Sequence, residues 1–429
     1  MTSEIKQRIE QINNGQVPTG YKETEFGIFP CDWVTDKTFG DLFSFNGGLS
    51  KSREELSENG IEYLHYGDMH RSDFNIASLE QYSKLPKYDT KIKGDESFLM
   101  QDGDVAFLDA SEDLEGTSRS VLIDNPENKP FIAGLHIIYG KPRGKELSKY
   151  YKQYLTRPEY IKKQFKKLAS GFKVYGLNRN TITGIKCAYP KSTAEQEKIA
   201  EILMKWDKAI ELQEKYIKKL KNQKDGYIKQ VLTSGSKYWE KHPLSCFLFK
   251  RNETQIPSTK APLMAFIAYE GISEKGERYD RSQLVKDDNK KYKITYLNDF
   301  IYSSNNLDVG SIGLNKYGTA VISVVYEVFG INEKAIPNII NEIIQLPRNM
   351  NRIINYRQGA FYGQYKINPD DFLKIEVHVP PMNVQVKLSN YFSSLENNIN
   401  KQKEKYQLLI QQRKAIQQYL LNGIVRVEV

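Results

Sequence analysis

The chain has few cysteines for disulfide bonds and no long apolar stretch for a membrane-spanning helix. Among its 429 residues there are only three cysteines, Cys31, Cys187 and Cys246, and they lie far apart. An odd number of dispersed cysteines argues against a disulfide framework and favours a reducing, cytoplasmic location. No stretch approaches the roughly 20 apolar residues that a membrane-spanning helix needs, and the polar N-terminus has no apolar signal core. We therefore expect neither a secreted disulfide-rich protein nor a membrane protein.

Signatures of metal and nucleotide chemistry are also sparse. The five histidines show no zinc-ligand spacing with the cysteines. No phosphate-binding loop of the form GxxxxGK[ST] occurs, which argues against ATP-driven chemistry. Carboxylates do cluster at Asp102, Asp104 and Asp109, which leaves a nuclease-type metal site as a minor alternative. Asp102-Gly103-Asp104 is better interpreted as a turn that leads into a strand.

The composition is that of a basic globular protein. Hydrophobic residues make up 39% and aromatic residues 12%, which is enough to build cores. A length of 429 residues predicts two or more domains. The net charge of +9 and the pI of about 9.0 favour an anionic partner, either nucleic acid or a membrane surface.

An internal repeat is the most informative feature of the sequence. A strand-like run that ends in proline occurs at 182–190 and again at 372–380. Asn178 and Asn368 precede these runs and lie 190 residues apart. Trp33 and Trp239 begin the two copies, and each copy later has a short helix with a proline near its start. A period of this length indicates duplicated domains rather than a solenoid of short repeats.

A long helical stretch follows each proline, and the two stretches share one pattern. Both place apolar residues at alternating spacings of four and three, the seam of a coiled coil. The first seam comprises Ile199, Leu203, Trp206, Ile210, Gln213, Ile217 and Leu220. The second comprises Leu388, Phe392, Leu395, Ile399, Gln402, Tyr406 and Leu409. Even the polar exceptions match, since Gln213 corresponds to Gln402 and Lys224 to Arg413.

The repeat predicts a chain that alternates domains and helices. We expect an N-terminal helix in 1–19, a first mixed α/β domain in 20–190 and a central helix in 191–235. A second domain in 236–381 and a C-terminal helix in 382–429 would complete the chain. Ile5, Ile9 and Ile12 stand at helical spacing and predict that the N-terminal helix packs on the long helices. Gly235 and Gly423 are expected to end the long helices.

This layout resembles the specificity subunit of type I restriction–modification systems. The opening GYKETEFGIFPCDW, residues 20–33, and the helix entry PKSTAEQEKI, residues 190–199, carry the resemblance together with the tandem order. The second helix entry matches more weakly, because Val384 stands where the first has Glu195. The resemblance implies an α+β protein with two target-recognition domains, a pseudo-two-fold repeat and an antiparallel coiled coil.

The resemblance also implies function and partners. Each recognition domain would read one half of a bipartite DNA target, while the helices set the spacing and dock two methyltransferase subunits. Restriction subunits that translocate DNA would join the full complex. S-adenosylmethionine, ATP and Mg²⁺ would belong to those partners, and this chain would carry no catalysis. In agreement, the only Pro-Pro pair, Pro380–Pro381, lacks the flanking residues of a methyltransferase base-gripping turn.

DNA contacts are expected from basic and polar residues in segments that follow strands. Lysine and arginine would bind phosphates, and polar side chains would reach base edges. The candidates in the first domain are Arg71, Arg119, Lys173, Tyr175, Asn178, Arg179 and Asn180. Those in the second domain are Asn305, Asn306, Lys316, Tyr317, Tyr362, Gln364 and Lys366. Asn178 and Asn368 have a second interpretation, as caps of the turns that follow them.

Two other classes of function remain open at this stage. The chain could be a lone methyltransferase or nuclease, against which the missing cofactor motifs argue. It could also be a coiled-coil scaffold that never touches DNA, which a salt-dependent DNA-binding titration would distinguish.

Overall fold

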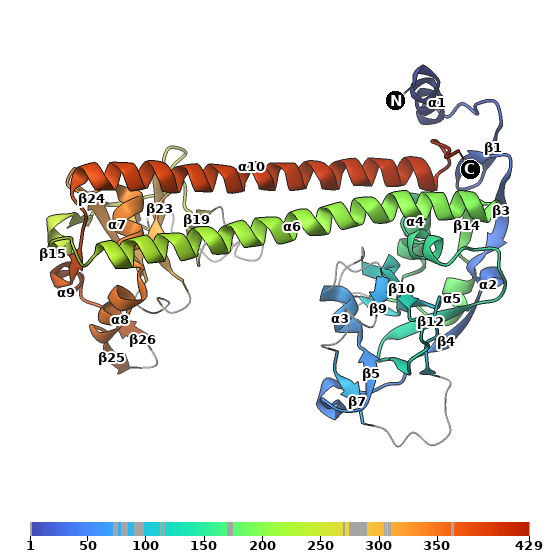
Figure 1. Ribbon diagram of the computed structural model, residues 1–429, viewed down its shortest axis with the longest axis horizontal. Coiled ribbons are helices and arrows are strands. Elements are labelled where there is room, and N and C mark those ends of the chain that lie inside the picture. Colours follow the sequence, from blue (N-terminus) through green and yellow to red (C-terminus); the bar gives the residue numbers. More distant parts are fainter. Residues whose placement is uncertain are drawn as a thin grey trace. The chain divides into compact units, whose positions relative to one another are not determined.

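The computed structural model divides the chain into two compact units. It describes residues 2–71, 76–78, 85–89, 98–111, 114, 116–169, 175–268, 271–273, 290–303, 305, 307, 310–361 and 364–428. Unit 1 comprises Met1–Gln213 and Lys405–Val429, and unit 2 comprises Glu214–Glu404. Each long helix therefore contributes one part to each unit (Figure 1).

Unit 1 begins with a short helix, a hairpin and a strand that reaches the start of the long helix. Helix α1 covers Ser3–Asn13, and β1 (Tyr21–Thr24) pairs with β2 (Gly27–Pro30). Strand β3 (Trp33–Thr38) then pairs antiparallel with β14 (Lys186–Pro190), which leads into the long helix. Helix α1 buries none of its residues, and Arg8 donates a hydrogen bond to the carbonyl of Ile424 at 3.0 Å. Instead of packing on the long helices as predicted, α1 is tied to the C-terminal tail.

The α/β domain of unit 1 is built on two small sheets. The five-stranded sheet has the order β4 (Phe43–Gly47), β12 (Ile137–Pro142), β8 (Val105–Leu108), β10 (Ser120–Asp124), β6 (Ile76–Ser78). The second sheet has the order β11 (Phe131–Ala133), β5 (Ile61–Leu64), β7 (Lys87–Tyr88). Short helices surround them: α2 (Phe39–Leu42), α3 (Tyr66–Arg71), α4 (Glu159–Leu168), α5 (Arg179–Thr183). One apolar core joins this domain to the long helices through Ile199, Leu203 and Leu420.

Unit 2 repeats the main sheet of unit 1. Its four-stranded sheet has the order β16 (Leu248–Lys250), β24 (Glu327–Ile331), β21 (Phe300–Tyr302), β22 (Ile312–Leu314). This is the order β4-β12-β8-β10 of unit 1, with antiparallel pairing throughout. Likewise β15 (Lys241–Pro243) pairs with β27 (Glu376–His378) as β3 pairs with β14. The duplication seen in the sequence is thus a duplication of topology.

The remaining elements of unit 2 complete the second domain. A three-stranded sheet has the order β17 (Thr254–Gln255), β20 (Tyr292–Thr295), β23 (Ala320–Ile322). Two hairpins are formed by β18 (Ala265–Ile267) with β19 (Gly271–Ser273) and by β25 (Gln358–Phe361) with β26 (Gln364–Lys366). The helices are α7 (Pro337–Ile344), α8 (Pro347–Asn355), α9 (Pro369–Lys374), and their apolar sides join the core of this unit.

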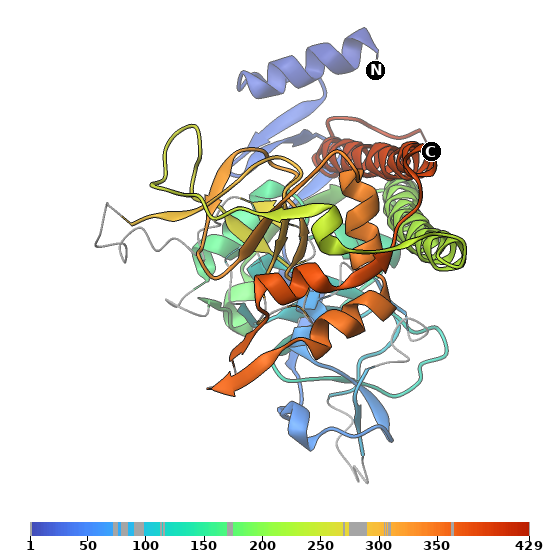
Figure 2. The ribbon, with the colours of Figure 1, turned by 90° about the vertical axis from the view of Figure 1, so that its left-hand side faces the viewer.

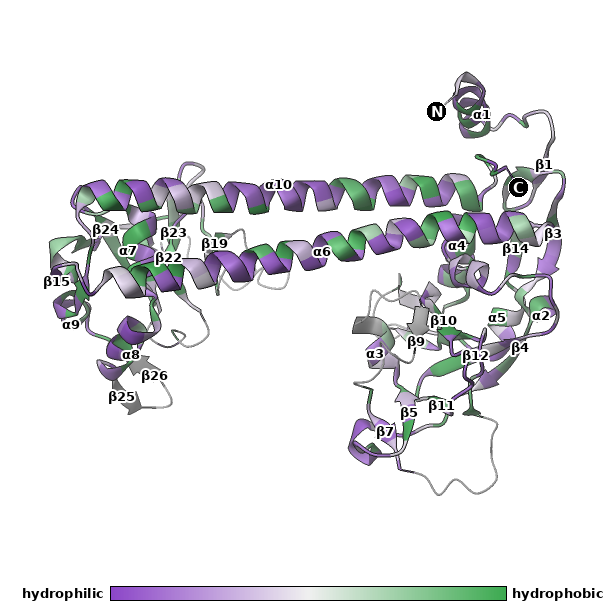
Figure 3. Cartoon of the chain, viewed as in Figure 1, coloured by the Kyte–Doolittle hydropathy of each residue, from purple (hydrophilic) through white to green (hydrophobic). Residues whose placement is uncertain are grey.

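The two long helices run antiparallel within each unit. Helix α6 covers Thr193–Gly235 and α10 covers Met382–Leu421. In unit 1 Asp207 pairs with Arg413 at 2.8 Å, and in unit 2 Lys224 pairs with Glu396 at 2.6 Å. Figure 2 views the two helices nearly end-on, and Figure 3 shows apolar residues recurring along both of them. The fourteen predicted seam residues are all buried or half-buried.

A glutamine near the start of each long helix fastens it to its own domain. The Gln196 amide nitrogen donates to the carbonyls of Glu146 and Pro190, while its oxygen accepts from the Ser148 amide. In unit 2 the Gln385 side chain repeats this pattern with the carbonyls of Lys334 and Pro380 and the amide of Ile336. Both side chains are buried. The recurring glutamine of the helix entries is therefore a structural residue.

The fold class predicted from the sequence is confirmed: two mixed domains of helix and sheet are joined by long helices. Within the described residues, no helix is long and apolar enough to cross a membrane.

Candidate nucleic-acid interface

Two of the predicted DNA-contacting segments meet in the first domain. Strand β9 (Ala110–Ser111) pairs antiparallel with β13 (Tyr175–Gly176). The amide of Leu177 also donates to the carbonyl of Asp109 at 2.7 Å. The segment that follows β8 and the loop that precedes α5 therefore form one surface, here called the β9–β13 junction. Sequence spacing alone could not predict this, because the segments lie more than sixty residues apart.

Arg119 connects helix α3 to the same region. One guanidinium nitrogen of Arg119 donates to the carbonyl of Met69 at 2.6 Å, and the residue is half-buried. Part of its hydrogen-bonding capacity is thus used inside the domain, which leaves less of it for a phosphate contact. Arg71 is the last residue of α3, and its side chain lies outside the described residues.

The loop before α5 contains both exposed candidates and a capping residue. Asn178 caps α5, since its side-chain oxygen accepts from the amide of Thr181 at 2.9 Å. Arg179 and Asn180 are exposed on the first turn, and Tyr175 is half-buried. Lys173 lies outside the described residues. The capping interpretation of Asn178 thus describes its role in the fold, and Arg179 and Asn180 remain available for DNA.

In the second domain the predicted residues divide into two groups. Asn305 is exposed just after β21, and the Tyr302 hydroxyl at the end of that strand donates to the carbonyl of Ile367 at 3.4 Å. This contact brings the end of β26, with the exposed Lys366, to the same end of the sheet. The side chain of Gln364 is outside the described residues, as are Asn306 and Tyr362. Asn368 caps α9 by accepting from the amide of Asp370 at 2.9 Å.

Lys316 and Tyr317 lie at the opposite end of the β21–β22 hairpin from Asn305. The hairpin register pairs Phe300 with Leu314, and the amide of Asn298 donates to the carbonyl of Asn315. Lys316 is near Glu342 of α7: burial raises the pKa of this carboxyl group, and the positive charge of Lys316 opposes the rise. Both residues are exposed, but they do not join the surface of Asn305 and Lys366. The predicted residues that follow β21 therefore lie in two separate places.

The three carboxylates named above as an alternative metal site all form hydrogen bonds or ion pairs within the first domain. Asp102 accepts from the Lys149 ammonium at 2.6 Å and from the amide of Asn125 at 2.7 Å. Asp104 is buried and accepts from the amide of Gln101 at 2.8 Å. Burial raises the pKa of Asp104 to about 6. Asp109 pairs with His136. The three acids have three different structural partners and form no common cluster.

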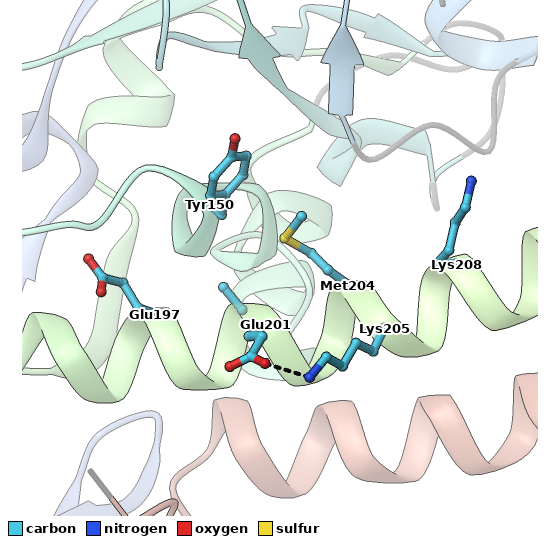
Figure 4. A pocket seen from close by; sticks show the side chains of 7 residues that line it. Tyr150, Glu197, Glu201, Met204, Lys205 and Lys208 are labelled. Atoms are coloured by element: carbon cyan, nitrogen blue, oxygen red, sulfur yellow. Dashed lines mark hydrogen bonds and ion pairs between the residues drawn. The ribbon is translucent and has the colours of Figure 1, made fainter. Parts of the chain in front are cut away.

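Two hollows lie along the long helices at corresponding turns. The first, of about 390 Å³, is lined by Tyr150, Glu197, Ala200, Glu201, Met204, Lys205 and Lys208 (Figure 4). The second, of about 440 Å³ on α10, is lined by Asn390, Ser393, Ser394, Asn397, Asn398 and Lys401. Four residues of the second hollow, at 390, 393, 394 and 397, lie 189 residues after counterparts in the first. The duplication thus extends to the outer surface of the helices.

Comparison with known proteins agrees with this architecture. A family model described as the type I restriction modification DNA specificity domain matches residues 30–222, which span most of the first domain and about two thirds of α6. This stretch is therefore similar to the DNA specificity domain of type I systems.

A curated relative and solved structures extend the match. The "Putative type I restriction enzyme MjaX specificity subunit" of Methanocaldococcus jannaschii is 23% identical over 216 residues, which are 50% of this chain and 49% of the relative. The matched segment thus spans about half the length of that relative. A chain from a structure of complex assembly and conformational transition of the type I R-M system has a TM-score of 0.59 at 12% identity. That match covers 96% of this chain and 100% of the other, and it shows a shared fold.

The crystal structure of a type I restriction–modification S subunit from M. genitalium matches with a TM-score of 0.48 at 13% identity, over 91% of this chain and 96% of the other. The family model and the curated relative confirm the resemblance to type I specificity subunits that the sequence suggested.

Proposed function

We propose that this chain is the non-catalytic subunit that gives a type I restriction–modification complex its DNA sequence specificity. The observation that carries the proposal is the duplicated domain, present once in each unit with the same sheet order. Two similar domains attached to a continuous pair of helices can read two separated half-sites on one duplex, at a spacing that the helices fix. The specificity-domain family of residues 30–222 supports DNA as the ligand.

We further propose that two methyltransferase subunits dock on the long helices, with restriction subunits joining the full complex. The two hollows on α6 and α10 support this stoichiometry, because duplicated surfaces offer equivalent positions to two copies of one partner. They differ in chemistry, since Met204 and Glu201 are replaced by Ser393 and Asn390. Native mass spectrometry of the co-purified complex counts the bound copies, and a complex that never exceeds one copy contradicts this stoichiometry.

The cofactors of the pathway belong, in this proposal, to the partners. S-adenosylmethionine would be bound by the methyltransferase subunits, and ATP and Mg²⁺ would serve the restriction subunits. The complex would act on DNA in the cytoplasm. Purified chain mixed with S-adenosylmethionine and DNA should transfer no methyl group until the methyltransferase partner is added, and transfer by the chain alone would contradict the proposal.

A domain exchange tests the two-reader model directly. Residues 20–190 are replaced by the equivalent domain of another specificity subunit, and the methylated sequence is mapped in cells that also express the methyltransferase partner. One half of the recognised sequence should change while the other half and the spacing stay constant. The matched exchange of residues 236–381 should change only the second half. A simultaneous change of both halves in either chimaera would reject the model.

A further inference from the structure

An exposed, rigidly held histidine lies beside the β9–β13 junction of the first domain. His136 occupies the turn between β11 and β12, and its side chain is 44% exposed. Its backbone is left-handed, with φ of +59°. The other two described non-glycine residues with positive φ are Asn128 and Asn298. Histidine tolerates this conformation as asparagine does, so the turn itself is not under unusual strain.

The imidazole of His136 is fixed by two neighbours. Its Nδ1 lies 2.9 Å from an Oδ1 of Asp109, whose own amide donates to the carbonyl of His136 at 3.1 Å. The ring of Tyr66 meets the imidazole edge-on, with ring centroids 5.2 Å apart and an interplanar angle of 85°. Backbone, carboxylate and aromatic ring together give the side chain one orientation although nearly half of it faces solvent. A surface histidine held in this way is preorganised to bind a ligand.

The carboxylate also fixes which ring nitrogen carries the proton. An ionised carboxylate only accepts hydrogen bonds, so Nδ1 of His136 is the donor toward Asp109. In the neutral imidazole the opposite nitrogen, Nε2, is then an acceptor. Among the described residues, no group forms a hydrogen bond with Nε2. The structure thus offers one oriented acceptor at this surface.

Asp109 links this acceptor to the segments that were predicted to touch DNA. Its carbonyl accepts from the amide of Leu177, directly before Asn178 and the exposed Arg179. The residue after Asp109 begins β9, which pairs with β13. The imidazole therefore stands at the place where the two contact segments of the first domain come together.

We propose that His136 reads one base of the half-site recognised by the first domain, an inference that rests on the proposed function. In the major groove, Nε2 accepts a hydrogen bond from the exocyclic amino group of adenine or cytosine. These two bases present an amino donor there, whereas guanine and thymine present acceptors. Asp109 is a positioning residue, because it acts only through the orientation and protonation of His136.

The test is selection of bound sequences from randomised duplex DNA by the purified chain in complex with its methyltransferase partner. His136→Gly keeps the left-handed backbone and removes the imidazole. It should lower the preference for adenine or cytosine about tenfold at one position of one half-site, with every other position unchanged. Asp109→Ala should weaken preference at that same position, and the double variant should lose no more than His136→Gly alone. Asn128→Gly, which removes a left-handed side chain elsewhere in the same domain, is the matched control.

The outcomes separate this inference from the proposed function. A His136→Gly complex that selects the unaltered sequence overturns the role of His136. A smaller salt dependence of binding with an unaltered sequence also overturns it, because this result identifies a phosphate contact. If the wild-type complex selects no sequence at all, the proposed function itself fails. His136→Asn, which suits the same backbone conformation, replaces His136→Gly if thermal unfolding shows that the glycine variant does not fold.

Discussion

The two long helices end in the same way, but the two ends are completed by different means. In unit 2, α6 ends at Gly235, where a Cβ atom would lie 2.2 Å from the ring of Trp239, four residues later in the chain. In unit 1 the corresponding residue is Gly423, with φ of +67°, and its neighbours Pro30 and Trp33 come from the other end of the chain. A covalent loop therefore holds one tryptophan in place, and non-covalent contacts must hold the other.

The C-terminal tail supplies these contacts. The Arg426 guanidinium forms paired hydrogen bonds with both Glu195 and Asp32, at distances between 2.7 and 2.9 Å. The hydroxyl of Tyr21 donates to the carbonyl of Gly423 at 2.6 Å. The side-chain hydrogen bond from Arg426 lowers the pKa of Asp32. The comparison indicates that charged side chains of the C-terminal tail stabilise in unit 1 the packing that a short covalent loop provides in unit 2.

Removing the arginine should have the largest effect. Arg426→Ala leaves Glu195, whose side chain is only 4% exposed, without its cation, and we expect unit 1 to lose about 3–4 kcal/mol of unfolding free energy. The measurement is urea denaturation followed by tryptophan fluorescence. Tyr238→Ala is the matched control, since Tyr238 holds the same place after Gly235 and is 87% exposed. Equal losses in the two variants would contradict a stabilising role for the Arg426 ion pairs.

The second prediction concerns the buried Asp104 and Asp299, which directly precede the equivalent strands β8 and β21. Asp104 and Asp299 each accept a backbone amide three residues earlier in the chain. Burial raises the pKa of Asp104 to about 6, above its ordinary value of 3.8. The folded state therefore holds a proton that the unfolded chain loses first, and stability falls as the pH rises from about 4 to 6, by about 3 kcal/mol.

Asp104→Asn should remove this slope, which urea denaturation at several pH values measures. Burial also raises the pKa of Asp299, but the hydrogen bond from Arg251, at 2.8 Å, opposes the shift. Asp299→Asn should therefore change the slope less. An unchanged slope in Asp104→Asn would show that the proton is held elsewhere.

At the start of each long helix the two units form the same hydrogen bonds, which gives the third prediction. Gln196 and Gln385 make equivalent hydrogen bonds, and we expect Gln196→Ala and Gln385→Ala to cost about 2 kcal/mol each. Each loss should appear in the unfolding of its own unit, which separate tryptophans report: Trp33 and Trp206 in unit 1, Trp239 in unit 2. A loss confined to one variant would mean that the two helix entries are not energetically equivalent.

Much of the fold could be predicted because the duplication makes each sequence pattern occur twice. The seam residues repeat over two helices, and the terminal glycines Gly235 and Gly423 recur after them. The packing of α1 could not be predicted, because three isoleucines at helical spacing do not reveal their partner. Arg8 and the C-terminal tail, which form the actual contact, carry no periodic pattern.

The candidate site was less accessible to sequence reasoning. Polar loop residues were identified by type, but Lys316 and Asn305 turned out to lie at opposite ends of one hairpin, because strand register is set by pairing and not by sequence distance. His136 was missed, since a lone histidine between two strands gives no signal without its partner. The charge of Asp109 is visible in the sequence, but only the pairing of distant strands brings this residue to His136.

The ion pairs between the long helices provide the finest test of equivalence between the units. Asp207–Arg413 and Glu396–Lys224 occupy corresponding positions with the acid on opposite helices. In unit 1 the pair is joined by the buried Tyr154, whose hydroxyl donates to Asp207 at 2.9 Å. The half-buried Arg157 lies nearby, and burial lowers its pKa to about 10.

Neutralising Asp207 removes a negative charge that offsets two guanidinium groups, whereas Glu396 is 39% exposed and pairs with Lys224. We therefore expect Asp207→Asn to cost about 1.5 kcal/mol and Glu396→Gln about 0.5 kcal/mol, because water screens the more exposed pair. Urea denaturation in low and high salt measures both, and only the smaller loss should vanish in high salt. Equal losses with equal salt dependence would mean that the domains, which supply Tyr154 and Arg157 in one unit alone, do not influence the helix pair.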